Sequence, residues 1–372
     1  MQHFRDNYPD WPVYDLAKPK QLEEFIAEVK EGRKAAGAIS YDTLWRRDQL
    51  LKIKGLTLIC DESSLISNEK AKRTKAILKM KKSGNLEHIV LLSGTPIDGK
   101  YERLISQAWL LDWDITKGDF YRRYIITRDI YVGAPMPVKV VVGYQNEEEL
   151  KENLRSHGAD FLTAEECLGS LPEQTFQELY SGTPSAYKKM DKYGICDIDG
   201  EEIIGDSILT QRLRLREICS VEFNDTRAEQ IKDILETCEE RVLIFYNFSS
   251  ERDRLLDICE KLKKPVSEIS GRRKDLEAYE NEENAVALLQ YAAGSMGHNL
   301  QKARITIFAS LPEKSEYYEQ AKCRTWRQGQ TRPCIYYICR SKGTIEDDIS
   351  EALARKKDLT DWLFIKEGRE AV

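Results

Sequence analysis

Two short stretches of the sequence decide the fold. Residues 56–64 read LTLICDESS, and residues 88–97 read HIVLLSGTPI. In each stretch an apolar run rich in β-branched residues stops at small polar or acidic residues, which is typical of a buried strand followed by a loop. Residues 56–60 carry no charge, so we expect this strand to be buried on both faces.

The same pattern continues along the chain. Apolar runs that predict strands lie at 242–246 (VLIFY), 305–309 (ITIFA) and 334–339 (CIYYIC), with a further strand near 285–290. Helical periodicity alternates with these strands at 20–34, 69–82, 227–240, 250–263, 314–327 and from 344 onward. Residues 38–44 are expected to be extended. Alternating strands and helices predict an α/β fold with parallel sheets.

Residues 112–171 interrupt this alternation. Aromatic, arginine-rich and acidic helical pieces are mixed there with glycine and proline. We therefore predict a first sheet domain over 1–111, a helical insertion or linker over 112–171, and a second sheet domain over 172–372. The length of 372 residues suits two or three domains.

The composition excludes several classes of protein. Hydrophobic residues make up 41% and charged residues 32% of the chain, which excludes fibrous and disordered classes. No apolar run approaches the length of a membrane helix, so no membrane partner is expected. The net charge of −6 argues against a protein that merely coats DNA, but it permits a local basic groove. Nine cysteines without a CxxC pair and four scattered histidines indicate reduced thiols in a cytosolic setting and no zinc site.

The ends of the predicted strands carry the candidate chemistry, because functional residues of open parallel sheets gather at the carboxyl ends of strands. Asp61 and Glu62 follow the first strand. One carboxylate of such a pair can hold Mg²⁺ while the other orients an attacking water, although an acidic solvated turn explains the pair equally well. Residues 93–96 (SGTP) could relay hydrogen bonds or simply end a strand.

Two further loops lie in the second half. The glycines in residues 294–300 (GSMGHNL) permit close approach of the backbone to a phosphate. Arg324 and Arg327 are three residues apart on a predicted helix, so they would share a face and could clamp a phosphate. A solvated basic helix end is the alternative for these arginines.

The order of these elements resembles helicase superfamily two, and within it the Swi–Snf-type DNA-stimulated ATPases. LICDESS is similar to motif II of that family and LLSGTPI to motif III. RVLIFYNF, AAGSMGHNLQKA and QAKCRTWRQGQ are similar to motifs IV, V and VI. The resemblance covers the chain from about Ala38 onward. The compact size and the DESS box look most like phage-encoded members, which implies the cytoplasm of a bacterial host.

The resemblance implies two RecA-like lobes with ATP and Mg²⁺ between them and duplex DNA as the track. Asp61 would hold the Mg²⁺, Glu62 would polarise water, and Arg324 and Arg327 would act as arginine fingers. The nucleotide contacts that it implies are Gly294, Gly297 and Gln320. The DNA contacts that it implies are Tyr41, Trp45, Arg46, Thr95, His298 and Asn299.

One family feature is absent from this sequence. The family begins with a Gly-Lys-Thr/Ser phosphate loop well ahead of motif II, and none lies among the 60 residues before Asp61. Residues 94–100 (GTPIDGK) fit a bare GxxxxGK pattern, but they lack the following Ser or Thr and fall on motif III. We therefore expect an incomplete first lobe. The alternatives are a non-hydrolysing DNA-binding relic, or half of a split ATPase whose partner polypeptide carries the loop.

The basic run at 70–82 (KAKRTKAILKMKK) has two interpretations. It could contact the phosphate backbone of DNA, or it could be a solvated helix face, which is the simpler and favoured interpretation. Trp109, Trp113 and Phe120 are expected to serve in packing.

Overall fold

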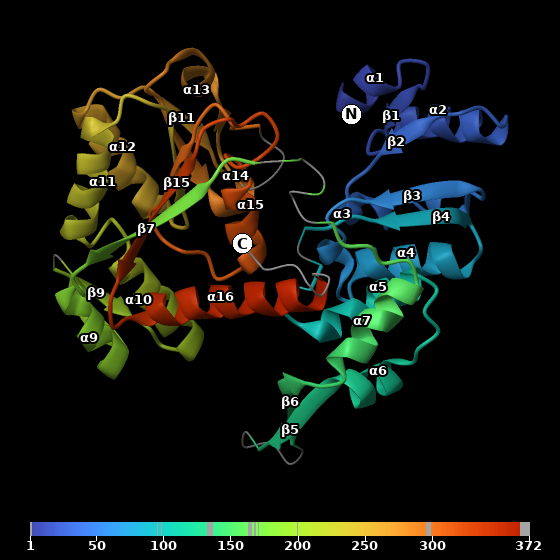
Figure 1. Ribbon diagram of the computed structural model, residues 1–372, viewed down its shortest axis with the longest axis horizontal. Coiled ribbons are helices and arrows are strands. Elements are labelled where there is room, and N and C mark those ends of the chain that lie inside the picture. The colour runs from blue at the N-terminus through green and yellow to red at the C-terminus, as the bar shows by residue number, and fades with distance from the viewer. Residues whose placement is uncertain are drawn as a thin grey trace. The chain divides into compact units, whose positions relative to one another are not determined.

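The computed structural model describes residues 2–94, 96–97, 99–131, 137–162, 166, 169, 171–198, 200–294 and 299–364. The chain divides into two compact units, residues Met1–Phe161 and Leu162–Val372 (Figure 1). Within the described ranges, no helix combines the length and the apolar character that crossing a lipid bilayer requires. The domain limits drawn from the sequence at 111/112 and 171/172 stay a prediction.

The second unit is built on a seven-stranded sheet with the strand order β12-β11-β13-β10-β14-β15-β7. Every neighbouring pair is parallel except β11–β12. The bounds of the strands are β7 Gln174–Ser181, β10 Val242–Tyr246, β11 Val266–Ile269, β12 Lys274–Asp275, β13 Val286–Gln290, β14 Ile305–Phe308 and β15 Cys334–Ser341. The predicted α/β fold with a parallel sheet is confirmed for this unit.

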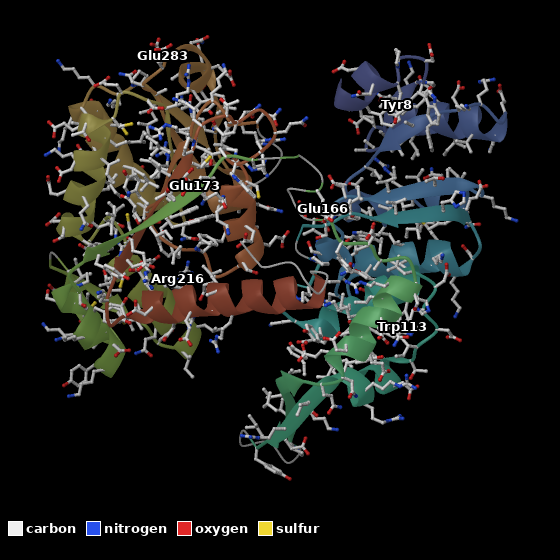
Figure 2. The ribbon with its side chains drawn as sticks, in the orientation of Figure 1. Tyr8, Trp113, Glu166, Glu173, Arg216 and Glu283 are labelled. Atoms are coloured by element: carbon white, nitrogen blue, oxygen red, sulfur yellow. The ribbon has the colours of Figure 1, made fainter. Side chains whose placement is uncertain are left out.

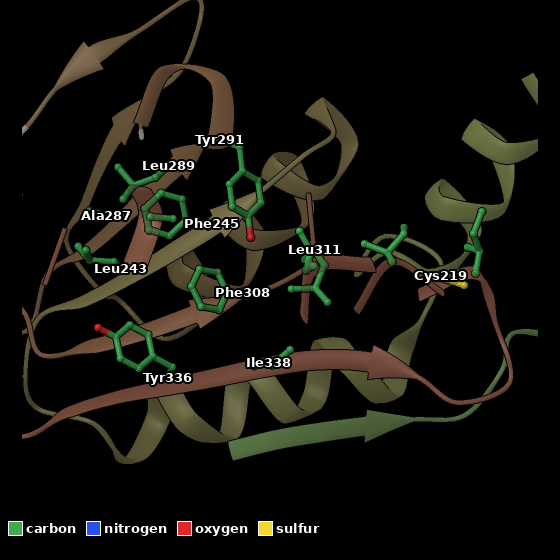
Figure 3. Packing of buried hydrophobic residues seen from close by; sticks show 14 of the residues in the cluster. Cys219, Leu243, Phe245, Ala287, Leu289, Tyr291, Phe308, Leu311, Tyr336 and Ile338 are labelled. Atoms are coloured by element: carbon green, nitrogen blue, oxygen red, sulfur yellow. The ribbon is translucent and has the colours of Figure 1, made fainter. Parts of the chain in front are cut away.

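Both faces of this sheet are covered by apolar clusters, and side chains alternate between the two faces along each strand. Leu243 and Phe245 of β10 join one apolar cluster, together with Leu289 and Phe308 of the neighbouring strands (Figure 3). Val242 and Ile244 point to the opposite cluster, which contains residues of α11 (Asp225–Thr237) and α12 (Ser249–Lys261). All five residues of β10 are buried, as the uncharged run VLIFY predicts.

The remaining elements of the unit flank the sheet. A small antiparallel hairpin joins β8 and β9, between α9 and α10. The bounds are α9 Ser185–Tyr193, β8 Ile195–Ile198, β9 Glu201–Ile204, α10 Ile208–Cys219, α13 Glu277–Asn281, α14 Tyr291–Gly294, α15 Ser315–Lys322 and α16 Ile345–Phe364.

A buried ion pair ties these elements together. Arg227 of α11 is fully buried and binds Glu346 of α16 through two hydrogen bonds, at 2.9 Å (Nη1–Oε1) and 2.5 Å (Nη2–Oε2). The guanidinium also donates to the carbonyl of Ala309 and to the hydroxyl of Ser341. Burial acts to lower the pKa of Arg227, but the charge of Glu346 raises it above its ordinary value. Arg227 therefore keeps its charge, and its hydrogen bonds join two helices to two strand ends.

The described part of the first unit holds only two-stranded sheets. Two parallel pairs are present, β1–β2 and β3–β4, and one antiparallel hairpin, β5–β6. The strand bounds are β1 Val13–Asp15, β2 Ala36–Ala38, β3 Leu56–Cys60, β4 Leu86–Leu91, β5 Ile125–Ile130 and β6 Val138–Tyr144. The helix bounds are α1 Gln2–Asn7, α2 Pro19–Lys30, α3 Tyr41–Leu44, η1 Leu50–Lys52, η2 Ser63–Ile66, α4 Lys72–Lys82, η3 Tyr101–Leu104, α5 Ile105–Leu110, α6 Lys117–Tyr124 and α7 Glu147–Ser156.

The β3–β4 pair is covered on one face only. Leu58 and Cys60 point into an apolar cluster with Leu22 and Phe25 of α2 and Ile77 of α4. On the other face the exposed fractions are 59% for Ile59, 41% for Val90 and 48% for Leu92. The expectation that residues 56–60 are buried on both faces is therefore wrong, because nothing in the described part of the unit covers this side.

Of two other local expectations, one is wrong and one is confirmed. Residues 38–44 are not one extended piece, because α3 begins after Ser40, whose carbonyl accepts hydrogen bonds from the amides of Thr43 and Leu44. Trp113, which is labelled in Figure 2, and Phe120 do serve in packing. Both side chains are buried, and their rings meet edge to face with centroids 6.1 Å apart.

Candidate functional site

The acidic pair stands at the carboxyl end of β3, in the loop that leads to η2. Asp61 is exposed, and its Oδ1 accepts a hydrogen bond from the amide of Glu62 at 3.1 Å. Glu62 adopts the left-handed conformation, with φ 50° and ψ 57°. This backbone costs an L-residue about 1–2 kcal/mol, so it persists only where neighbouring contacts fix it. Residues held in this way cluster at functional sites. The backbone conformation of Glu62 therefore adds a structural reason, beyond the sequence motif, to regard Glu62 as a functional residue.

Three hydrogen bonds hold this loop in place. The amide of Leu92 donates to the carbonyl of Cys60 at 2.9 Å, and the amide of Ser63 donates to the carbonyl of Leu92 at 2.8 Å. The hydroxyl of Tyr41 donates to the carbonyl of Asp61 at 2.6 Å. Burial raises the pKa of Tyr41 above its ordinary value, and the nearby Cys60 and Asp61 add to this shift, so the hydroxyl remains a donor at neutral pH. Tyr41, which we predicted as a DNA contact, thus lies directly against the acidic loop.

A buried glutamine links the two loops that follow β3 and β4. Gln107 of α5 accepts a hydrogen bond from the hydroxyl of Ser63 at 3.3 Å, and its Nε2 donates to the carbonyl of Pro96 at 2.8 Å. Sequence reasoning missed this residue, because a single amide inside the helical run LISQAWLL gives no signal of a tertiary role. Gln107 therefore positions DESS and SGTP relative to each other.

Two further predicted DNA contacts, Trp45 and Arg46, directly follow α3 and form a cationic aromatic group with Lys72. The Cζ atom of Arg46 lies 5.0 Å from the ring centroid of Trp45, and Nζ of Lys72 lies 4.6 Å from the same centroid. Arg46 is exposed and Trp45 is half-buried. A cation over an aromatic face is held there by the quadrupole of the ring. Thr95, also predicted to contact DNA, lies outside the described residues.

The arginines of motif VI do not share a helix face as predicted. Helix α15 ends at Lys322, and Arg324 and Arg327 lie in the turn that follows it. Nε of Arg324 donates to the carbonyl of Gln320 at 3.1 Å, so two of the candidate residues are in contact. The chain turns because Thr325 is buried, and because the indole of Trp326 donates to the carbonyl of Pro172 at 2.7 Å.

A second glutamine fixes the end of this turn. Nε2 of Gln330 donates to the carbonyls of Gln301 and Ala303, both at 3.0 Å. Gln301 lies two residues beyond Asn299, another predicted DNA contact, which is exposed. Gln330 therefore ties motif VI to motif V. Gly294 is the last residue of α14, and Gly297 and His298 lie outside the described residues.

A polar cluster that the sequence did not point to stands at the carboxyl ends of β10 and β14. Glu251 of α12 is fully buried, and its Oε2 accepts from the amides of Asn247 and Phe248 and from the hydroxyl of Ser310. Burial raises the pKa of Glu251, although these hydrogen bonds oppose the shift. The carboxylate caps the helix and fixes the loop that follows β10.

One family model matches a part of the second unit. Residues 226–329, all in the second unit, match the family described as "Helicase conserved C-terminal domain". Together with the parallel sheet and the strand-end loops, this match supports an α/β helicase-type domain.

Several curated proteins align with most of the chain. The chain is 25% identical over 370 residues to a Drosophila melanogaster protein named "SWI/SNF-related matrix-associated actin-dependent regulator of chromatin subfamily A-like protein 1", with 96% of this chain and 47% of the relative covered. A Xenopus laevis protein of the same name is 26% identical, covering 88% of this chain and 35% of the relative. An "Uncharacterized ATP-dependent helicase" of Mycoplasma genitalium is 23% identical, covering 83% of this chain and 31% of the relative. These matches support the Swi–Snf type of helicase superfamily two.

The chain spans half or less of the length of these three relatives. Among solved structures, the C-terminal part of the Fun30 ATPase domain aligns with a TM-score of 0.38 and 16% identity, over 52% of this chain and 98% of that one.

Proposed function

We propose that this chain is part of an ATP-driven translocase-type motor that acts on duplex DNA. The observation that carries the proposal is the alignment of 370 residues with a Swi–Snf-related protein, since it runs through both units. The acidic loop of the first unit and the motif VI turn of the second unit both lie within it.

The residues present could hold the Mg²⁺ ion of a nucleotide site. Asp61 offers an exposed carboxylate at a strand end, and Mg²⁺ in nucleotide sites takes one or two carboxylates plus phosphate oxygens. No group of three or more His, Cys, Asp or Glu side chains that could hold a metal occurs in the described part of the chain, so phosphate oxygens would have to complete the shell. Mg²⁺ bound there would neutralise charge on the phosphates.

The other residues have proposed roles toward the same nucleotide. Glu62 would orient the attacking water, and Arg324 and Arg327 would stabilise charge on the transferred phosphoryl group. The phosphates also need a backbone cradle and a lysine, and these 372 residues contain no Gly-Lys-Ser/Thr loop to supply them. The chain alone therefore lacks the groups that would hold the phosphates for hydrolysis.

The open face of the β3–β4 pair favours a segment that completes the lobe. Parallel sheets are ordinarily covered on both faces, yet Ile59, Val90 and Leu92 are exposed here. In the described part of the unit, each strand of the pair has one neighbour only. We propose that an α/β segment with a phosphate loop, on the same or another polypeptide, covers this face. A non-hydrolysing DNA-binding protein remains the alternative function.

The test is phosphate release from ATP by the purified chain, with and without duplex DNA, before and after addition of a phosphate-loop segment from a relative. We expect little turnover by the chain alone and DNA-stimulated turnover after complementation, abolished by Glu62→Gln. DNA binding without turnover in any combination would favour the non-hydrolysing alternative. Robust turnover by the chain alone, lost in Glu62→Gln, would show that another segment cradles the phosphates.

A further inference from the structure

Helix α4 presents a stripe of lysines to solvent. The lysines of this stripe are exposed and recur at i, i+3, i+7 and i+10, which places them on one helix face; they are Lys72, Lys75, Lys79 and Lys82. The opposite face is buried through Thr74, Ile77 and Met80. The stripe is about 15 Å long, because ten residues each rise about 1.5 Å.

These four lysines differ from the other basic residues of the helix. Arg73 is paired with Asp42 at 3.4 Å, and Lys81 is paired with Asp112 at 2.7 Å. None of the four stripe lysines forms an ion pair with a carboxylate of the described residues. Their charges are therefore available to an external anion.

The first two lysines of the stripe do not serve the stability of the helix. The amino end of a helix carries partial positive charge, so Lys72 and Lys75, within the first four residues, are placed unfavourably. No acidic residue stands in that first turn to offset them. Only Lys79 and Lys82, near the carboxyl end, gain from the helix dipole. Residues that break a local rule without a local gain indicate a function.

The stripe continues the cationic aromatic group described above, because Lys72 lies over the ring of Trp45 beside Arg46. Residues 70–82 carry seven basic and no acidic side chains, in a chain whose net charge is −6. This concentration of one sign attracts a polyanion. We propose that the α4 stripe binds the sugar-phosphate backbone of duplex DNA next to Trp45 and Arg46. The inference rests on the proposed function and adds a contact to it.

The experiment measures DNA affinity against salt concentration. Each phosphate contact contributes about 0.9 to the slope of log K against log salt for duplex DNA. The full chain, a Lys75→Gln, Lys79→Gln, Lys82→Gln variant and a control variant are titrated onto a fluorescent duplex, and anisotropy is read at several salt concentrations. The stripe variant should lose about 2 to 3 from the slope. It leaves Lys72 and its contact with Trp45 intact.

The matched control changes the same number of charges in the other unit. It replaces three exposed lysines of α9, namely Lys188, Lys189 and Lys192, with glutamine. This variant should keep the slope, and both variants should melt like the unaltered chain. If the unaltered chain binds duplex and the stripe variant keeps its slope, the inference fails while the proposed function stands. Equal losses in both variants also overturn it, and no binding by the unaltered chain overturns both proposals.

Discussion

Replacing Glu62 by glycine should strengthen the loop that carries the acidic pair. With φ 50° and ψ 57°, Glu62 stands in a region that costs an L-residue about 1–2 kcal/mol and costs glycine almost nothing. Glycine also adds about 0.4–1 kcal/mol of backbone entropy to the unfolded chain. The balance leaves Glu62→Gly more stable than Glu62→Ala by about 1 kcal/mol. Both variants lack the carboxylate, so the comparison isolates the backbone.

Hydrogen exchange of the Leu92 amide measures this difference. That amide donates to the carbonyl of Cys60 and exchanges when the end of β3 and the loop beyond it open. Leu92 lies 30 positions from residue 62 along the chain, so its intrinsic exchange rate is the same in both variants. A difference of about 1 kcal/mol corresponds to roughly fivefold greater protection in Glu62→Gly.

The result also bears on function. Because glycine relieves the strain and removes the proposed catalytic carboxylate, Glu62→Gly should combine a firmer loop with no DNA-stimulated turnover after complementation. Equal or greater protection in Glu62→Ala would refute the reasoning, since it would mean that the left-handed backbone costs nothing at this position.

Two further predictions concern the second unit. Glu346→Gln leaves the buried guanidinium of Arg227 without its counter-charge, so the free energy of unfolding of the unit should fall by about 3–5 kcal/mol. Calorimetry should then show a melting temperature lowered by about 6–20 °C, and a loss under about 1 kcal/mol contradicts the prediction. In the complemented enzyme, Arg324→Lys and Arg327→Lys should each lower kcat roughly 10³-fold while the nucleotide Kd changes far less, because lysine lacks the planar fork and the contact tightens in the transition state. A near-normal kcat in both variants removes the arginine-finger role.

Some strands of the second unit could be predicted from the sequence and others could not. The run VLIFY matches β10 (Val242–Tyr246) residue for residue, because a strand buried on both faces must be uncharged and continuous. Strand β7 (Gln174–Ser181), with the sequence QTFQELYS, escaped prediction. It is an edge strand whose only described neighbour, β15, lies about 160 residues away in sequence, so tertiary pairing rather than its own composition makes it a strand.

The candidate site was predictable in its residue types but not in its geometry. The position of Asp61 and Glu62 at a strand end follows from the break in LTLICDESS, and the structure places them there. The common helix face of Arg324 and Arg327 does not exist. The chain turns after Lys322 because Thr325 is buried and because the side-chain amide of Gln330 donates hydrogen bonds to the carbonyls of Gln301 and Ala303. Helical spacing cannot reveal such a stop when the deciding contacts come from distant segments.

The strained residue and the open sheet face belong to the same strand. Ile59 and Glu62 are three residues apart, on β3 and in the loop directly after it, and β4 is the only described neighbour of that strand. A segment that packs on Ile59 and Val90 would stiffen β3 and hold its carboxyl end more firmly. Because the left-handed conformation of Glu62 persists only where its surroundings fix it, covering this face would also fix the carboxylate. In the proposed motor, the segment that we propose to carry the phosphate loop would therefore add to the hydrogen bonds of Tyr41, Ser63 and Leu92 that already hold the acidic loop.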